Sequence, residues 1–284
     1  MTGQPLQQTR RWEANLSLDF CVSNHSNHVS RTIINKRAHF GPLVIQKPFY
    51  PEGDPCHIYL LHPPGGLVGG DRLSLNVSLQ KDTHVLITTP GAAKFYRSNG
   101  HIATQQQTIS IADNALLEWL PQETIIFDQS NAQVQTLVEL TDGAKFIGWE
   151  IACLGRPAGN QPFIDGQFVQ KIRLLRNNKP LVIERALYQG NAPILSSPWG
   201  LANHTTAGTM MITPANQQLL ESIRTQVKVD SPQLFSATLM NGVLVCRYLG
   251  TQAANAKKIF IQVWEIARPA LQNINACIPR IWNT

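Results

Sequence analysis

A glycine-rich stretch from His62 to Arg72 is the segment of this chain best suited to close contact with a ligand or a neighbouring backbone. Four glycines within six residues indicate positive φ angles or a close backbone approach. A phosphate-binding loop needs a Lys-Ser/Thr pair after its glycines, whereas Asp71 and Arg72 follow here, so the sequence disfavours nucleotide binding. Two interpretations stay open: a buried turn in which Asp71 accepts hydrogen bonds from backbone amides, or a functional channel or interface. The four glycines are Gly65, Gly66, Gly69 and Gly70.

A second motif, Thr88 to Ser98, gathers three polar or charged side chains within four residues. Lys94, Tyr96 and Arg97 suit a catalytic lysine or an anion site. The sequence offers no base or nucleophile that can be assigned as their partner. A surface turn with an aromatic ring packed beneath it therefore remains an alternative.

Carboxylates interrupt apolar segments further along the chain, at Glu118, Glu123, Asp128 and Glu150. A buried carboxylate is costly unless it is paired, hydrogen-bonded or bound to a cation. Three interpretations follow: a pair of carboxylates for glycoside hydrolysis, buried arginine–carboxylate pairs, or a polar path for a divalent cation. The sequence gives no carboxylate separation, so it does not choose among them.

Metal-ligating side chains occur in two small groups, neither with the four-ligand spacing of a structural zinc site. Cys56, His57 and His62 form one group, and their thiol and imidazoles suit transient contact with a metal such as nickel. His25 and His28 lie in a polar segment that is typical of a solvated loop.

The elements that must position these groups are mostly strands. Apolar and polar residues alternate over 73–80, 147–153 and 169–174, which is the pattern of β-strands. Asp-Gly at 142–143 and Asn-Gly at 241–242 are turn signals between such runs. We therefore predict an all-β-dominated fold of many short strands.

Two helices are expected in the C-terminal third. Thr213 and Pro214 are predicted to cap and open the first, which carries apolar residues to about 227 at helical spacing. The second is predicted over 252–267, with Pro269 ending or kinking it. We expect a polar N-terminal tail over residues 1–11 and one elongated β-rich domain over 12–284.

Composition narrows the function classes. Charged residues make up 15% of the chain, fewer than the typical quarter, which indicates either a small surface or a surface partly hidden in partners. The net charge of +6 suits binding to nucleic acid or to an acidic protein, although the basic residues form no stripe.

The five cysteines are scattered and odd in number, so we expect no disulfides. The N-terminus has no apolar run that could act as a signal, so we expect a cytoplasmic protein.

Together these motifs resemble the UreD/UreH family of urease accessory proteins. Residues 62–71 and 89–98 are similar to its two signature stretches, and residues 118–125 are similar to its third. Segments 41–48 and 154–156 extend the resemblance, which runs from about 12 to at least 190. The matching functional positions are Gly65, Gly66, Gly69, Gly70, Asp71, Lys94, Tyr96, Arg97, Glu118 and Glu123.

The resemblance implies a non-enzymatic scaffold that bridges UreF, and through it the GTPase UreG, to the urease apoprotein. It implies no permanently bound cofactor and a transient passage of Ni²⁺ through the interior. Scattered carboxylates suit such a passage because oxygen ligands release nickel more readily than a thiolate cage does. We predict the passage carboxylates to be Asp71, Glu118, Glu123 and Glu150, with Cys56, His57 and His62 as transient nickel contacts.

Two other functions remain open on the sequence alone. A carboxylate-dependent hydrolase would turn over a small molecule or sugar without partners. A basic nucleic-acid-binding β-protein would bind with steep salt dependence through a basic face.

Overall fold

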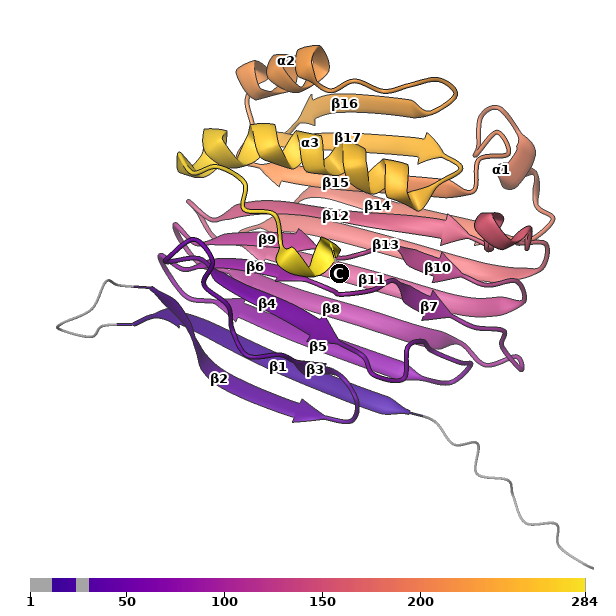
Figure 1. Ribbon diagram of the computed structural model, residues 1–284, viewed down its shortest axis with the longest axis horizontal. Coiled ribbons are helices and arrows are strands. Elements are labelled where there is room, and N and C mark those ends of the chain that lie inside the picture. Colours follow the sequence, from indigo (N-terminus) through magenta and orange to yellow (C-terminus); the bar gives the residue numbers. More distant parts are fainter. Residues whose placement is uncertain (1–11, 24–30, 284) are drawn as a thin grey trace, which may run out of the picture.

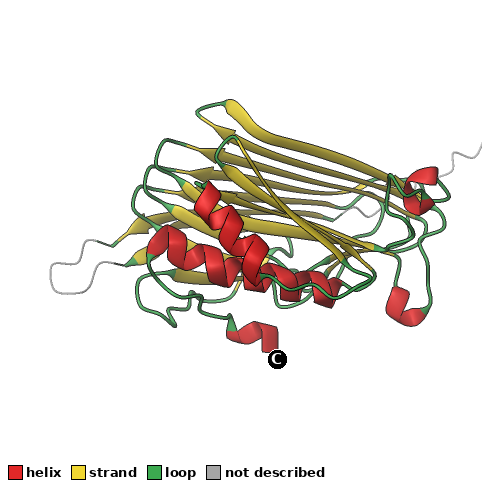
Figure 2. Cartoon of the chain, turned by 90° about the horizontal axis from the view of Figure 1, so that it is seen from above, coloured by secondary structure: helices red, strands yellow, loops and turns green. Residues whose placement is uncertain are grey.

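The computed structural model describes residues 12–23 and 31–283. Two β-sheets lie face to face, and the two longer helices pack on the outer side of one of them (Figure 1, Figure 2). The prediction of a β-dominated domain with its helices late in the chain is confirmed.

The first sheet has seven strands in the order β14-β13-β11-β8-β5-β1-β2. All of its inner pairs from β1 to β13 are parallel, and antiparallel β2 and β14 close the two edges. In chain order its strands are β1 (Glu13–Val22), β2 (Thr32–Phe40), β5 (Arg72–Leu79), β8 (Ala103–Ile111), β11 (Ser130–Leu140), β13 (Gly166–Arg176) and β14 (Lys179–Gln189).

The second sheet has ten strands, ordered β16-β17-β15-β12-β9-β6-β4-β3, with β10 and β7 joined beside β12. Its strands are β3 (Val44–Ile45), β4 (Cys56–Leu61), β6 (His84–Thr88), β7 (Ala93–Phe95), β9 (Leu116–Leu120), β10 (Thr124–Ile126), β12 (Lys145–Leu154), β15 (Thr206–Thr213), β16 (Leu234–Met240) and β17 (Val243–Gly250). The helices are η1 (Pro157–Gly159), α1 (Pro193–Ser196), α2 (Gln217–Gln226), α3 (Ala253–Gln272) and η2 (Arg280–Asn283).

From β4 to β13 the chain passes back and forth between the two sheets. Parallel neighbours need a crossover connection, and here a strand of the other sheet supplies it. Each circuit thus adds one strand to the seven-stranded sheet, so equivalent inward positions stack on one another from strand to strand.

Alternation along each strand decides which side chains enter the core between the sheets. In β5, Leu73, Leu75, Val77 and Leu79 are buried, while the residues between them face outward. The period-2 prediction for this strand is confirmed. The same alternation holds in β11, where every second residue from Ser130 to Leu140 is buried.

The ten-stranded sheet is buried on both faces because α2 and α3 cover its outer side. Trp149 of β12 packs with Phe260 of α3, their ring centroids 6.1 Å apart. The predicted apolar side of this helix is confirmed, since Ile259, Phe260, Val263 and Trp264 are all buried.

The predicted start of the first helix is wrong. Thr213 is the last residue of β15 and pairs with Phe146, and the helix begins at Gln217 with Asn216 as its N-cap. The side chain of Asn216 accepts a hydrogen bond from the backbone N–H of Leu219 at 2.9 Å. Sheet pairing thus outcompetes the local capping preference of Thr213.

The second helix also runs further than predicted. Pro269 lies inside α3, which ends only at Gln272. A proline removes its own N–H donor, but its carbonyl still accepts, here from Asn273 at 2.8 Å. The short α1 was not predicted, and none of the helices in the described part of the chain is long and apolar enough to cross a membrane.

Replacing Phe260 with Ala should reduce the free energy of unfolding by about 3–5 kcal/mol, because a fully buried ring between sheet and helix is lost. Urea titration followed by tryptophan fluorescence measures this. Ile278→Ala is the control, because that side chain is 39% exposed and should change stability by less than about 0.5 kcal/mol. Equal effects would contradict the packing role of α3.

Candidate functional site

A cavity of about 350 Å³ lies between the two sheets and opens at one end of the sandwich. Its rim is formed by exposed residues of the two glycine-containing motifs, including Pro63 and Gly91. Its inner end is lined by buried Trp119 and Val134, and by Glu150. The cavity therefore leads from the surface into the core between the sheets.

The two motifs that the sequence singled out pair with each other at this rim. The backbone N–H of Leu67 donates to the carbonyl of Lys94, and the N–H of Tyr96 donates to the carbonyl of Leu67, both at 2.8 Å. Leu67 and Phe95 are buried below the contact. Segments that are separate in the sequence thus form one structural unit around the cavity mouth.

The four glycines of this unit are required for two different reasons. Gly65 and Gly70 have φ angles of +79° and +99°, so they occupy the left-handed region as predicted. Gly66 and Gly69 do not have positive φ angles, so only the second predicted reason, a close approach, can apply to them.

Close packing explains Gly66 and Gly69 instead. A Cβ on Gly66 would collide with the Tyr96 ring and lie 2.9 Å from the Lys94 carbonyl oxygen. A Cβ on Gly69 would lie 2.9 Å from the carbonyl oxygen of His101. These glycines allow the two motifs to approach each other.

Asp71 binds backbone amides in this unit. Its Oδ1 accepts from the N–H of Trp12 at 3.0 Å and its Oδ2 from the N–H of Val68 at 2.9 Å. The carboxylate is buried, and it is not among the residues that line the cavity. It holds the glycine-rich turn against the start of β1.

Glu150 is the carboxylate that the structure places in the cavity wall. It projects from β12 toward the seven-stranded sheet, where Thr136 Oγ1 donates to one of its oxygens and Gln170 Nε2 donates to the other at 2.7 Å. Thr136 also lies 3.3 Å from Gln107 Oε1. Burial, and secondarily the nearby charge of Glu184, raise the pKa of Glu150 above its ordinary value.

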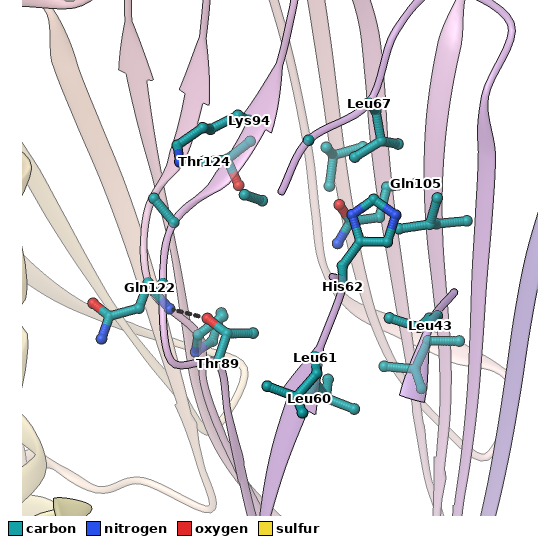
Figure 3. A pocket seen from close by; sticks show the side chains of 18 of the residues that line it. Leu43, Leu60, Leu61, His62, Leu67, Thr89, Lys94, Gln105, Gln122 and Thr124 are labelled. Atoms are coloured by element: carbon teal, nitrogen blue, oxygen red, sulfur yellow. Dashed lines mark hydrogen bonds between the residues drawn. The ribbon is translucent and has the colours of Figure 1, made fainter. Parts of the chain in front are cut away.

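Polar side chains continue from Glu150 toward the mouth. Figure 3 shows His62 and Gln105 on one side of the pocket and Lys94 and Thr124 on the other. Burial lowers the pKa of His62, which favours its neutral imidazole. The Lys94 ammonium makes no hydrogen bond or ion pair within residues 12–23 and 31–283.

This arrangement suits temporary binding of a divalent cation. A carboxylate, amide oxygens, a hydroxyl and a neutral imidazole are all possible ligands. The positive charge of Lys94 at the cavity wall opposes a tightly held cation there.

Glu118 occupies a different place, on the opposite face of the ten-stranded sheet under α3. Its Oε1 lies 2.6 Å from His84 Nε2 and accepts from Arg268 Nε at 3.0 Å, and Trp264 donates to its other oxygen. Burial opposes ionisation of Glu118, but the contacts with His84 and Arg268 outweigh it and hold its pKa below the ordinary value.

Arg268 extends this buried network to Glu52. Its Nη2 and Nη1 donate to the two carboxylate oxygens of Glu52 at 2.6 and 2.7 Å, and His57 Nε2 lies 2.6 Å from Glu52 Oε1. Burial raises the pKa of Glu52, but hydrogen bonds from His57 and Arg268 lower it to about 2. The network fastens α3 to the sheet and accounts for Glu118 as a structural ion pair.

The candidate metal ligands are not brought together. Cys56 and His57 are successive residues of β4 and face opposite sides of the sheet. Burial raises the pKa of the Cys56 thiol to about 11, which disfavours a thiolate ligand. In the part of the chain that the structure describes, no three His, Cys, Asp or Glu residues are grouped to hold a metal. His25 and His28 lie outside the described residues.

The remaining predicted residues are not part of the cavity lining. Tyr96 packs on Phe127 with ring centroids 4.8 Å apart, and Arg97 is exposed. The carbonyl of Glu123 accepts from the N–H of Ala93 at 3.0 Å. Asp128 accepts from two backbone amides on another loop, so it shares no hydrogen-bond partner with Glu118 or Glu123.

Sequence reasoning missed Gln107, Thr136 and Gln170. A signal for them was present, because each is a polar residue at an inward position of an otherwise apolar strand face. Such a position demands a polar partner across the core, and Glu150 is that partner for Thr136 and Gln170.

The sequence of this chain matches a known family model and is similar to the sequences of several named proteins. The model of the family described as UreD urease accessory protein matches residues 13–283. A urease accessory protein UreD from Pseudoalteromonas translucida is 42% identical over 287 residues, covering 100% of this chain and 95% of the relative. Proteins of the same name from Enterobacter sp. (strain 638) and Citrobacter koseri are each 39% identical, covering 100% and 97% of this chain and 100% and 93% of the relatives.

Gly66→Ala should lower the free energy of unfolding by about 1–3 kcal/mol, because the new methyl group overlaps the Tyr96 ring. Gly91→Ala in the facing motif is the matched control, since no atom lies within 4 Å of its added Cβ. Thermal unfolding of both variants checks this. A Gly66→Ala protein as stable as the Gly91→Ala protein would show that the close approach is not needed.

Glu150→Gln should raise the melting temperature at about pH 8, and the gain over the wild type should shrink as the pH falls toward about 5. The reason is that the pKa of Glu150 is raised in the folded chain. As the pH falls through it, the folded wild type binds a proton before the unfolded chain does and gains stability that the glutamine variant cannot gain.

Glu118→Gln is the contrasting control for this experiment. Because the pKa of Glu118 is lowered, its charge stabilises the fold at neutral pH. Its removal leaves Arg268 with one fewer buried partner and should cost about 3–5 kcal/mol. The melting temperatures of the two variants and of the wild type are measured across this pH range. A Glu150→Gln protein that is less stable than the wild type at every pH would contradict a raised pKa of Glu150 in the folded chain.

Proposed function

This chain belongs to the UreD urease accessory protein family, and we propose that it acts in urease maturation as a non-enzymatic scaffold that passes nickel through its interior. In this proposal the chain brings UreF, and through UreF the GTPase UreG, to the urease apoprotein in the cytoplasm. Nickel is the cargo, and the chain keeps no cofactor permanently.

The observation that carries the proposal is the cavity between the sheets with Glu150 in its wall. A glutamate in an otherwise apolar core is costly, and its two hydrogen bonds do not bring its pKa back to the ordinary value. A divalent cation would relieve this cost by favouring the ionised form. Such a carboxylate is therefore expected where a cation passes.

The ligands along this route support transfer rather than storage. Glu150 and the amide of Gln107 offer oxygen, and His62 offers a neutral nitrogen at the outer end. The buried thiols of Cys56 and Cys246 have raised pKa values of about 11 and 12, so they are poor competitors for nickel. A cation that enters can thus leave again.

The glycine-rich motif is consistent with a chain that binds no nucleotide of its own. Its glycines serve turn geometry and close packing, and Asp71 is occupied with backbone amides, so the motif is accounted for without a nucleotide. Energy for directed nickel transfer would then come from the partner GTPase.

A strain that lacks this protein should make urease that is nickel-poor and inactive. Wild-type protein should restore it, whereas Glu150→Gln should need at least about tenfold more nickel for half-maximal urease activity, because a charged ligand is lost from the route. Nickel content of purified urease, measured by atomic absorption at limiting and excess nickel, is the readout.

Glu139→Gln is the matched control, because Glu139 lies on the outward side of β11, away from the cavity. It should restore urease as the wild type does. Co-purification of UreF and urease with each variant separates assembly from nickel transfer. Full nickel loading by Glu150→Gln at limiting nickel would refute the route, and normal nickel content in the deletion strain would refute the scaffold function itself.

A further inference from the structure

The outward face of β13 and β14 carries an uncompensated cluster of cations. Lys171 of β13 and Arg185 of β14 are directly opposed in the antiparallel pair, and Arg173 is two residues along on the same face. None of the three makes an ion pair within residues 12–23 and 31–283. Like charges directly opposed across a strand pair destabilise a sheet, so this arrangement is unfavourable in the isolated chain.

The outward positions of these two strands hold no carboxylate to offset the charge. The register pairs Gln167 with Gln189, Val169 with Leu187, Lys171 with Arg185, and Arg173 with Ile183. The one acidic residue of β14, Glu184, faces inward, where Thr209 Oγ1 donates to it at 3.2 Å. The charges of Lys171, Arg173 and Arg185 therefore lie on the outer side, where neither strand carries a carboxylate.

Apolar side chains lie among these cations. Ile183 is 61% exposed and Leu187 is 44% exposed, and they flank Arg185 on the same face of β14. Isolated exposed aliphatics are ordinary, but two of them beside an unneutralised cation pair form a combined apolar and basic patch. We call this group, Lys171, Arg173, Ile183, Arg185 and Leu187, the β13–β14 patch.

Neither of the longer helices covers this patch. The helices α2 and α3 pack on the ten-stranded sheet, and Figure 2 shows them on one side of the sandwich only. The outer face of the seven-stranded sheet is thus open at the edge formed by β13 and β14.

We propose that the β13–β14 patch docks a protein partner whose surface carries carboxylates around an apolar centre. Carboxylates would neutralise the opposed Lys171 and Arg185, and the apolar centre would cover Ile183 and Leu187. Nucleic acid fits less well, because the patch has exposed aliphatic side chains between its cations and no aromatic ring for base stacking at its outward positions.

The test measures binding of the purified chain to the immobilised urease apoprotein and, separately, to immobilised UreF. The chain is co-expressed with UreF where this is needed for solubility. The choice of these probes rests on the proposed function. Reversing two charges, Lys171→Glu with Arg185→Glu, should weaken binding to one of the two probes by at least about tenfold at about 0.1 M salt. The wild-type affinity for that probe should fall steeply as salt rises. Ile183→Ser should weaken the same interaction without changing its salt dependence.

Lys36→Glu with Arg37→Glu on β2 is the matched control, because it makes the same charge change on exposed residues at the opposite edge of the same sheet. Thermal unfolding of every variant shows that the fold is kept. Unchanged affinity of the Lys171→Glu/Arg185→Glu variant for both probes would refute the proposal that the β13–β14 patch docks a partner. Loss of duplex-DNA binding with both protein affinities intact would overturn it in favour of a nucleic-acid surface.

Failure of the patch and failure of the proposed function give different results. If wild-type chain binds a probe and the patch variant binds equally, only the patch is refuted. If wild-type chain binds neither probe, the scaffold function fails, and with it the partner assigned to this surface.

Discussion

The face-to-face packing of two mostly parallel sheets is the constraint on which the rest of the structure depends. Because successive strands alternate between sheets, inward positions stack in register, and any polar side chain there must find its partner on a neighbouring strand or across the core. Thr136 and Gln170 on the seven-stranded sheet meet this demand through Glu150 on the other. The same register that buries leucines in β5 thus assembles a polar line inside the sandwich.

Glu118 and Glu150 are stabilised in opposite ways. Glu118 is surrounded by His84 and Arg268, so its charge is neutralised and its pKa is lowered. Burial, and secondarily the negative charge of Glu184, raise the pKa of Glu150, and the hydrogen bonds from the neutral Thr136 and Gln170 side chains do not offset them. The first arrangement is complete without a further ion and holds α3 in place. The second would become more favourable with a cation beside it, which is why only Glu150 is placed on the proposed nickel route.

The sequence predicted the strands and the motifs around the cavity well, because period-2 alternation and glycine spacing are local signals. It could not tell Glu118 from Glu150, since both interrupt apolar strands of the ten-stranded sheet. Both faces of that sheet are buried, so alternation says that neighbours face opposite sides without saying which side meets the helices. Glu118 pairs with Arg268 from the far end of the chain, a contact that no local pattern encodes. The predicted helix start was wrong for the same reason, because Thr213 pairs with Phe146 on a strand far away in sequence.

The polar interior and the β13–β14 patch share the same two strands, so the proposed nickel route and the proposed docking surface lie on opposite sides of one strand pair. Gln170 and Glu184 face inward from β13 and β14, whereas Lys171 and Arg185, one residue along each strand, face outward. Glu184 also pairs with Arg247 of β17, so these strands are tied to the opposite sheet through an ion pair. The β13–β14 pair thus carries both a hydrogen-bond donor to Glu150 on its inner side and the cations of the β13–β14 patch on its outer side.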